Sequence, residues 1–186
     1  MIRLFFALRP PPAIRDALAD LMDGVPDARW QDDEQLHLTL RFVGEVDRPV
    51  AEDLAAALEG LRAPAPVVAP VVALRGVGAF GGRGRAGALW AGLAPPEPLV
   101  ALHRKLDQLC VRVGLAPEGR AFTPHVTLAR LPRGVPLGAP EVEGWRARHA
   151  GLSSEPFALD RVLLYRSRLG RAGATYEPVA AARLSG

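Results

Sequence analysis

A four-residue pattern occurs twice in this chain, as HLTL at residues 37–40 and as HVTL at residues 125–128. Alternate residues of an extended strand project from the same face. In each copy the histidine and the threonine therefore share one face, while the two aliphatic residues point into a core. The repeat predicts two buried strands that each carry an imidazole and a hydroxyl on the open side. If these strands face one another, they form a cleft with two imidazoles and two hydroxyls.

Other segments repeat in the same order, with offsets between 85 and 90 residues. In each half an apolar strand runs into a double proline, a helix with leucines at helical spacing follows, and a further strand comes after a proline. A period this long that occurs twice indicates duplication of a supersecondary unit. We predict a single bilobal domain over residues 1–186, built from units at about 1–85 and 86–186. The repeated segments are the strands at 4–8 and 89–93, the helices at 13–22 and 97–113, and the strands at 66–74 and 156–164.

These patterns predict an α+β fold with two pseudo-symmetric lobes, each an antiparallel sheet backed by helices, and a central cleft between them. A helix over 50–61, capped by Asp47, completes the first half. Its counterpart in the second half is rich in Pro and Gly over 132–140, so we expect a loop or a short helix before residue 154. The Gly-rich segment 76–87 predicts a flexible basic loop. It serves either as a hairpin connection or as an arm that closes over a nucleic-acid strand.

The composition is that of an ordinary globular protein, with 49% hydrophobic and 23% charged residues in 186. No stretch approaches the ~20 apolar residues that span a bilayer, so we expect no membrane partner. A single cysteine, Cys110, favours a reducing cytoplasm, and its apolar surroundings predict burial. The net charge of +3 permits a nucleic-acid partner. No heptad pattern is present, so we expect a monomer without an obligate protein partner.

The paired motifs suit acid–base chemistry on a phosphodiester. Imidazole titrates near pH 6.5, so one ring can be neutral and accept a proton from water while the other donates a proton to a departing oxygen. The hydroxyls of Thr39 and Thr127 can hold the non-bridging phosphate oxygens, and Arg130 can add a positive charge to that pocket. His37 and His125 are therefore the candidate catalytic residues.

Metal ligation is the alternative use of paired histidines. The acidic run at 32–34 precedes the first motif, but the second motif has no matching carboxylate, so we interpret the run as a solvated turn. We therefore predict no metal site. His103 and His149 lack a threonine partner and are expected on the surface or at a helix packing edge.

The two motifs and their surroundings resemble the two-histidine (2H) phosphoesterase superfamily, in particular its RNA 2′,3′-cyclic phosphodiesterase branch, which is also called 2′-5′ RNA ligase. The resemblance implies hydrolysis of an RNA 2′,3′-cyclic phosphate to the 2′-phosphomonoester without metal or nucleotide cofactor. It also implies His37 as proton donor and His125 as proton acceptor. The resembling stretches are 3–8, 30–44, 74–80, 89–90, 122–130 and 164–167.

An RNA end also needs a flat surface for its base. Phe42 and Tyr165 are the candidates for base stacking. The arginines at 161, 166, 168 and 171 form a candidate basic rim. Two other functions stay open: a module that binds an RNA end or nucleotide without turnover, and a phosphodiesterase or ligase that acts on 2′-5′ linkages.

Overall fold

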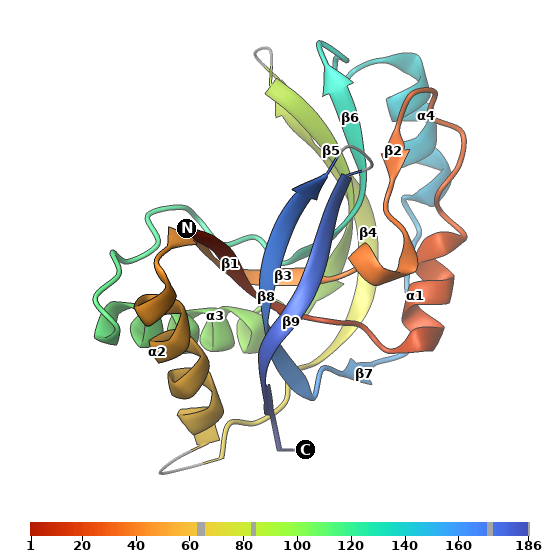
Figure 1. The fold of residues 1–186 in the computed structure, drawn as a ribbon. Helices are drawn as coiled ribbons and strands as arrows, with labels where there is room; N and C mark the ends of the chain where they lie inside the picture. Colours follow the sequence, from red (N-terminus) through yellow and green to blue (C-terminus); the bar gives the residue numbers. More distant parts are fainter. Residues whose placement is uncertain (63–65, 83–84, 171–172, 186) are drawn as a thin grey trace.

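The computed structural model describes residues 1–186 except 63–65, 83–84, 171–172 and 186 (Figure 1). Within the described residues, nine strands form one antiparallel sheet in the order β7-β4-β5-β6-β3-β1-β8-β9, and β2 pairs beside β6. The strands are β1 (Ile2–Leu8), β2 (Arg29–Trp30), β3 (Leu38–Val46), β4 (Val71–Gly82), β5 (Arg85–Ala94), β6 (His125–Arg133), β7 (Phe157–Ala158), β8 (Arg161–Gly170) and β9 (Gly173–Arg183). The helices are α1 (Pro12–Ala19), α2 (Arg48–Glu59), α3 (Glu97–Arg112) and α4 (Pro140–His149), with short 3-10 turns at Asp33–Gln35 and Gly60–Arg62.

The two motif strands, β3 and β6, lie side by side at the middle of the sheet. We call β3, β1, β8 and β9 the first lobe, and β6, β5, β4 and β7 the second lobe. Neither lobe is a continuous stretch of chain, because β8 and β9 come from the C-terminal part and β4 comes from the N-terminal part. The predicted α+β fold with two antiparallel lobes backed by helices is confirmed.

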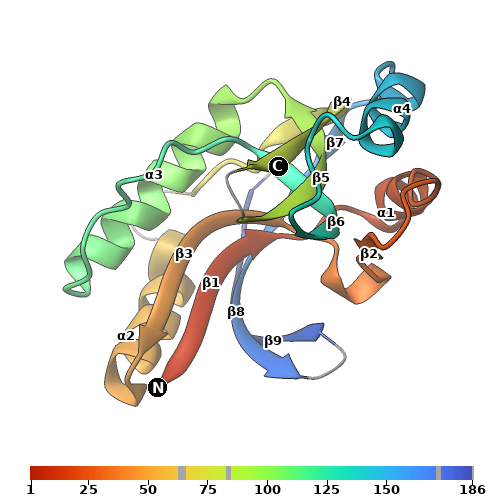
Figure 2. The ribbon, with the colours of Figure 1, turned by 90° about the horizontal axis from the view of Figure 1, so that it is seen from above.

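The helices cover the outer faces of the lobes in two pairs. Figure 2 shows α2 and α3 together beside the first lobe, and α1 and α4 together beside the second. The indole Nε1 of Trp145 on α4 donates to the carbonyl oxygen of Leu21, just after α1, at 2.8 Å. Trp145 is fully buried. The second pair of helices is therefore joined by a buried hydrogen bond as well as by apolar packing.

The helices begin where the sequence predicts them. A proline occupies the first turn of α1, α2 and α3, where its missing N–H costs no hydrogen bond. The side chain of Asp47 accepts a hydrogen bond from the Val50 N–H at 3.1 Å, so the predicted cap of α2 is confirmed. The segment after 140, for which a loop or short helix is expected, forms α4. Cys110 is buried, as predicted.

Of the two alternatives for the segment 76–87, the hairpin connection is confirmed, whereas the expected flexible loop is wrong for the described part. Residues up to Gly82 continue β4, residues from Arg85 begin β5, and the two strands pair as a hairpin. Arg83 and Gly84 lie outside the described residues. A Cβ at Gly78 would lie 2.1 Å from the ring of Trp90. Only glycine fits here, because the indole of Trp90 covers the strand at this position. Sequence alone cannot distinguish this use of glycine from flexibility.

The strands that follow proline differ from the prediction in both halves. The expected strand at 66–74 is β4, which starts later, at Val71. The expected strand at 156–164 is divided into the short β7, which starts at Phe157, and β8, which starts at Arg161 and runs further. The described residues contain no helix that is both long and apolar enough to span a membrane.

Candidate active site

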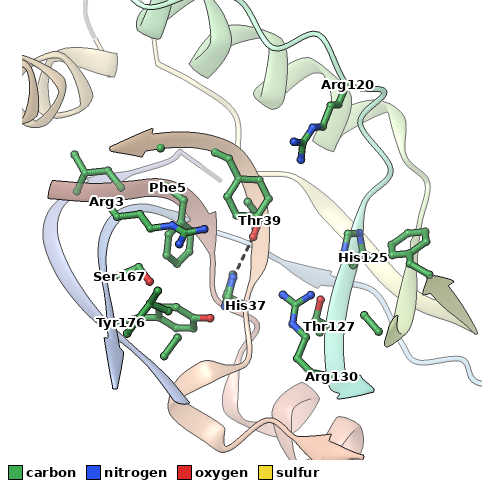
Figure 3. Close-up of a pocket in the computed structure, with 17 residues that line it drawn as sticks. Arg3, Phe5, His37, Thr39, Arg120, His125, Thr127, Arg130, Ser167 and Tyr176 are labelled. Atoms are coloured by element: carbon green, nitrogen blue, oxygen red, sulfur yellow. Dashed lines mark hydrogen bonds between the residues drawn. The ribbon is translucent and has the colours of Figure 1, made fainter. Parts of the chain in front are cut away.

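The two motifs meet across one cavity. Leu38 lies directly opposite Val126, so the flanking residues of both strands leave the same face of the sheet. Extended by one residue in each direction, this antiparallel register places Thr127 opposite His37 and His125 opposite Thr39. All four side chains line a single cavity of about 600 Å³ (Figure 3). The structure thus brings together the four residues that the repeat singles out.

Main-chain carbonyls fix the orientation of both imidazoles. Nδ1 of His37 lies 2.6 Å from the Gln35 oxygen, and Nδ1 of His125 lies 2.7 Å from the Thr123 oxygen. A carbonyl can only accept, so Nδ1 carries the hydrogen in both rings, and Nε2 is left as the exchangeable position. Nε2 of His37 lies 3.0 Å from Oγ1 of Thr39, which donates to it when the ring is neutral. Both rings are therefore held in the same tautomer.

Burial keeps both rings neutral. It lowers the pKa of His37 from 6.5 to about 4; the hydrogen bond to Gln35 opposes this shift, and the positive charge of Arg130 adds to it. The pKa of His125 is lowered for the same reasons, mainly burial, with a smaller contribution from Arg130. The ordinary pKa of imidazole allows one neutral and one protonated ring near pH 7. In the free protein both are neutral, because both are desolvated and both lie near Arg130.

Aromatic side chains enclose the imidazoles. The ring centroids of Phe5 and Tyr176 each lie 5.0 Å from that of His37, with Tyr176 in an edge-on arrangement. Phe80 meets His125 edge-on at 4.9 Å. These contacts restrict ring rotation and supply the apolar surroundings that depress the two pKa values.

A β-bulge follows each motif and changes which residues face the cavity. Leu40 is an extra residue in β3 opposite the Phe6–Ala7 step of β1, and Leu128 is an extra residue in β6 opposite the Leu89–Trp90 step of β5. An extra residue reverses the alternation of faces beyond it. Phe42 and Arg130, each three residues after the motif threonine, consequently line the cavity.

The first bulge also sends Arg41 to the opposite face. Arg41 is buried, and its Nε donates to Oδ1 of Asp107 on α3 at 2.7 Å. Its Nη2 donates to the Ala116 oxygen at 2.6 Å, and its Nη1 lies 3.5 Å from a carboxylate oxygen of Glu118. Arg41 therefore holds the segment after α3 against β3, and this segment delivers Arg120 to the cavity.

Of the two base-stacking candidates, only Phe42 lines the cavity, where it is 53% exposed. Tyr165 is buried and stacks on Phe5 with centroids 5.4 Å apart, so it supports the cavity wall from behind. In the candidate basic rim, Arg168 pairs with Glu177 at 3.0 Å, and Arg171 lies outside the described residues.

Several cavity residues are not predicted as site residues from the sequence, among them Arg3, Phe5, Arg120 and Tyr176. The alternation of Arg3 and Phe5 along β1 is a usable signal, because these residues share a face. Arg120 and Tyr176 carry no local signal, since an irregular segment and the distant strand β9 bring them to the site.

The remaining polar candidates serve packing. His103 donates from Nδ1 to the Leu40 oxygen at 2.7 Å and stacks flat on Phe122, so it lies at a helix packing edge as expected.

The acidic run at 32–34 is more ordered than a solvated turn, because Asp33 pairs with Arg9 and Arg15, each at 2.7 Å. Among the described residues, no three His, Cys, Asp or Glu side chains gather in a way that could hold a metal ion.

An antiparallel two-lobed sheet whose central strands present His-x-Thr pairs to one cavity defines the two-histidine phosphoesterases. The chain belongs to the 2′-5′ RNA ligase superfamily, whose family model matches residues 10–171. It is 31% identical over 175 residues to an RNA 2′,3′-cyclic phosphodiesterase of Geobacillus stearothermophilus, with 94% of this chain and 53% of the relative covered. An RNA 2′,3′-cyclic phosphodiesterase of Aeropyrum pernix is 35% identical over 119 residues, which cover 63% of this chain and 64% of the relative.

The alignments therefore span about half to two thirds of the length of these two curated relatives. A solved structure of Escherichia coli LigT complexed with 3′-AMP superposes with a TM-score of 0.75 at 26% identity, and covers 100% of this chain and 99% of that one.

Proposed function

We propose that the protein hydrolyses RNA 2′,3′-cyclic phosphate ends to 2′-phosphomonoesters by acid–base catalysis between His37 and His125, without a metal ion or other cofactor. The observation that carries the proposal is that both rings, in one tautomer, line the same cavity with Thr39 and Thr127. The names of the relatives support the reaction, and the nucleotide bound by LigT supports the class of ligand.

His125 is proposed as the base. Its ring is neutral near pH 7, so Nε2 can accept a proton from a water molecule as the water oxygen attacks phosphorus. The hydrogen bond from Nδ1 of His125 to the Thr123 oxygen is exposed, whereas the one from Nδ1 of His37 to the Gln35 oxygen is partly buried. This difference supports the assignment, because the base must meet water.

His37 is proposed as the acid. As the bond between phosphorus and the ribose 3′ oxygen breaks, Nε2 of His37 gives its proton to that oxygen, which leaves as a hydroxyl. The ring is neutral in the free protein, so it must take up this proton when the anionic phosphate binds and offsets the cost of burying a cation. In the free protein the hydroxyl of Thr39 is hydrogen-bonded to Nε2 of His37, and the substrate must replace this hydroxyl.

The hydroxyls and Arg130 stabilise the charge that develops on the phosphate. Thr39 and Thr127 are the proposed donors to the non-bridging oxygens, and Arg130 is the proposed cation at the same site. Phe42, exposed at the cavity wall, is the proposed stacking surface for the base. RNA is thus the proposed partner; the cytoplasmic location and monomeric state stay predictions from the sequence.

The test is product analysis on an RNA oligomer that ends in a 2′,3′-cyclic phosphate, in the presence of chelator. We expect the 2′-phosphomonoester, and a loss of ~10²–10⁴-fold in kcat for His37→Ala and for His125→Ala. Full activity of His125→Ala, or a 3′-phosphate product, contradicts the mechanism. Tight binding of 2′-AMP without turnover of any cyclic substrate identifies a binding module instead. Faster cleavage of 2′-5′ oligomers than of cyclic ends identifies the third alternative.

A further inference from the structure

A second, smaller cavity continues from the candidate active site. It measures about 290 Å³ and shares Arg130, Leu169, Ala174 and Tyr176 with the larger cavity. Its additional lining includes Arg29 from β2 and Gly173 from β9. The two cavities therefore adjoin at Arg130, with the two imidazoles lining one and Arg29 lining the other.

Two arginines lie next to each other in this second cavity. Arg29 and Arg130 are direct cross-strand partners between β2 and β6, so their side chains leave the same face with Cα atoms ~4.5–5.5 Å apart. Like charges in this position repel. Within the described residues, neither guanidinium has a carboxylate within ion-pair distance, although Arg9, Arg15, Arg41 and Arg168 do. A pair of uncompensated guanidinium groups in a hollow is suited to an anion.

The side chain of Arg29 crosses toward the first lobe. A Cβ at Gly173 would lie 3.2 Å from its Nη2 and 3.7 Å from Nε2 of Gln35. Gln35 is itself held by a hydrogen bond from Nε2 to the Ala174 oxygen at 2.8 Å. A side chain at position 173 would therefore crowd the guanidinium of Arg29 and touch the amide of Gln35.

We propose that Arg29, together with Arg130, binds the backbone phosphodiester on the 5′ side of the terminal nucleotide. The inference rests on the proposed function and names its substrate class: an oligonucleotide end, in preference to a mononucleoside cyclic phosphate. In an RNA that ends in a cyclic phosphate, the next anion along the chain can only be this 5′ phosphodiester. Arg130 lines both cavities, so it stands between the reacting phosphate and the second one.

The test compares three substrates. They are a nucleoside 2′,3′-cyclic phosphate, a dinucleotide with one phosphodiester and a terminal cyclic phosphate, and the same dinucleotide with a neutral methylphosphonate linkage. We expect kcat/KM to be about 10- to 100-fold higher for the charged dinucleotide than for either of the others, the range for hydrogen bonds to a charged group. In Arg29→Ala we expect this ratio to fall most of the way toward 1, with Arg130 still in place. In Arg29→Lys we expect an intermediate value, because the charge stays but the bidentate geometry is lost.

A salt titration gives a second measurement. Loss of one phosphate contact to a single strand should reduce the slope of log kcat/KM against log salt concentration by about 0.7 for the charged dinucleotide. Arg48→Ala is the matched control, since Arg48 is exposed on α2 and pairs with Glu52 at 2.8 Å. This control should keep both the ratio and the slope of the wild type.

The outcomes separate the two proposals. Equal kcat/KM for all three substrates in the wild type, or an equal loss on all three in Arg29→Ala, overturns the second phosphate site while the proposed hydrolysis stands. If no cyclic substrate is turned over, the proposed hydrolysis fails. In that case the second phosphate site is tested by equilibrium binding. The affinity for the 2′-phosphorylated dinucleotide is compared with the affinity for a nucleoside 2′-phosphate. Tighter binding of the dinucleotide that Arg29→Ala removes supports the site, and equal affinities overturn it.

Discussion

Acidification should destabilise the folded protein through His37. Burial lowers the pKa of this ring from 6.5 to about 4 in the folded state, so the unfolded chain binds the proton more readily between these values. The contribution of this ring to the free energy of unfolding is therefore fully present above pH 6.5 and is lost as the pH falls toward 4. The difference of roughly 2.5 pKa units corresponds to about 3 kcal/mol, most of which is already lost at pH 4.5.

The measurement is urea unfolding at pH 7.0 and pH 4.5, for the wild type and for His37→Asn, whose side chain does not titrate. A loss of about 2–3 kcal/mol should move the wild-type midpoint by about 1 M urea more than that of the variant. Carboxylates with lowered pKa values, such as Asp33 and Asp107, also respond to acid, but they are common to both proteins and cancel in the difference. If the two proteins lose stability in parallel, or if an NMR titration places the His37 midpoint near 6.5, the argument from burial is refuted.

Two further predictions concern packing around the site. Gly78→Ala should cost about 1–3 kcal/mol, because its methyl group would overlap the indole of Trp90, whereas Gly119→Ala, with nothing within 4 Å, should stay within about 0.5 kcal/mol in the same urea assay. Arg41→Met should cost about 3 kcal/mol, because it leaves the carboxylate of Asp107 without its buried partner. A cost below about 0.5 kcal/mol for Gly78→Ala or for Arg41→Met would show that the surrounding structure relaxes around the change.

Much of the fold could be predicted because its signals are local. Prolines at helix starts, the Asp47 cap and leucines at helical spacing are read within one or two turns of chain, and α1, α2 and α3 form close to the expected positions. The start of β4 and the choice of a hairpin over a flexible arm in the Gly-rich segment could not be predicted in this way. They depend on which strand lies alongside and on the indole that covers Gly78.

The sequence by itself determined that each motif places a histidine and a threonine on one face, because the alternation of a strand depends only on its own backbone. Only the tertiary structure decided that Arg130 and Phe42 join them while Arg41 turns away, because a bulge exists only relative to the neighbouring strand. It also decided that both imidazoles are neutral. Their pKa values are set by burial among residues from distant strands, such as Tyr176, and by the charge of Arg130.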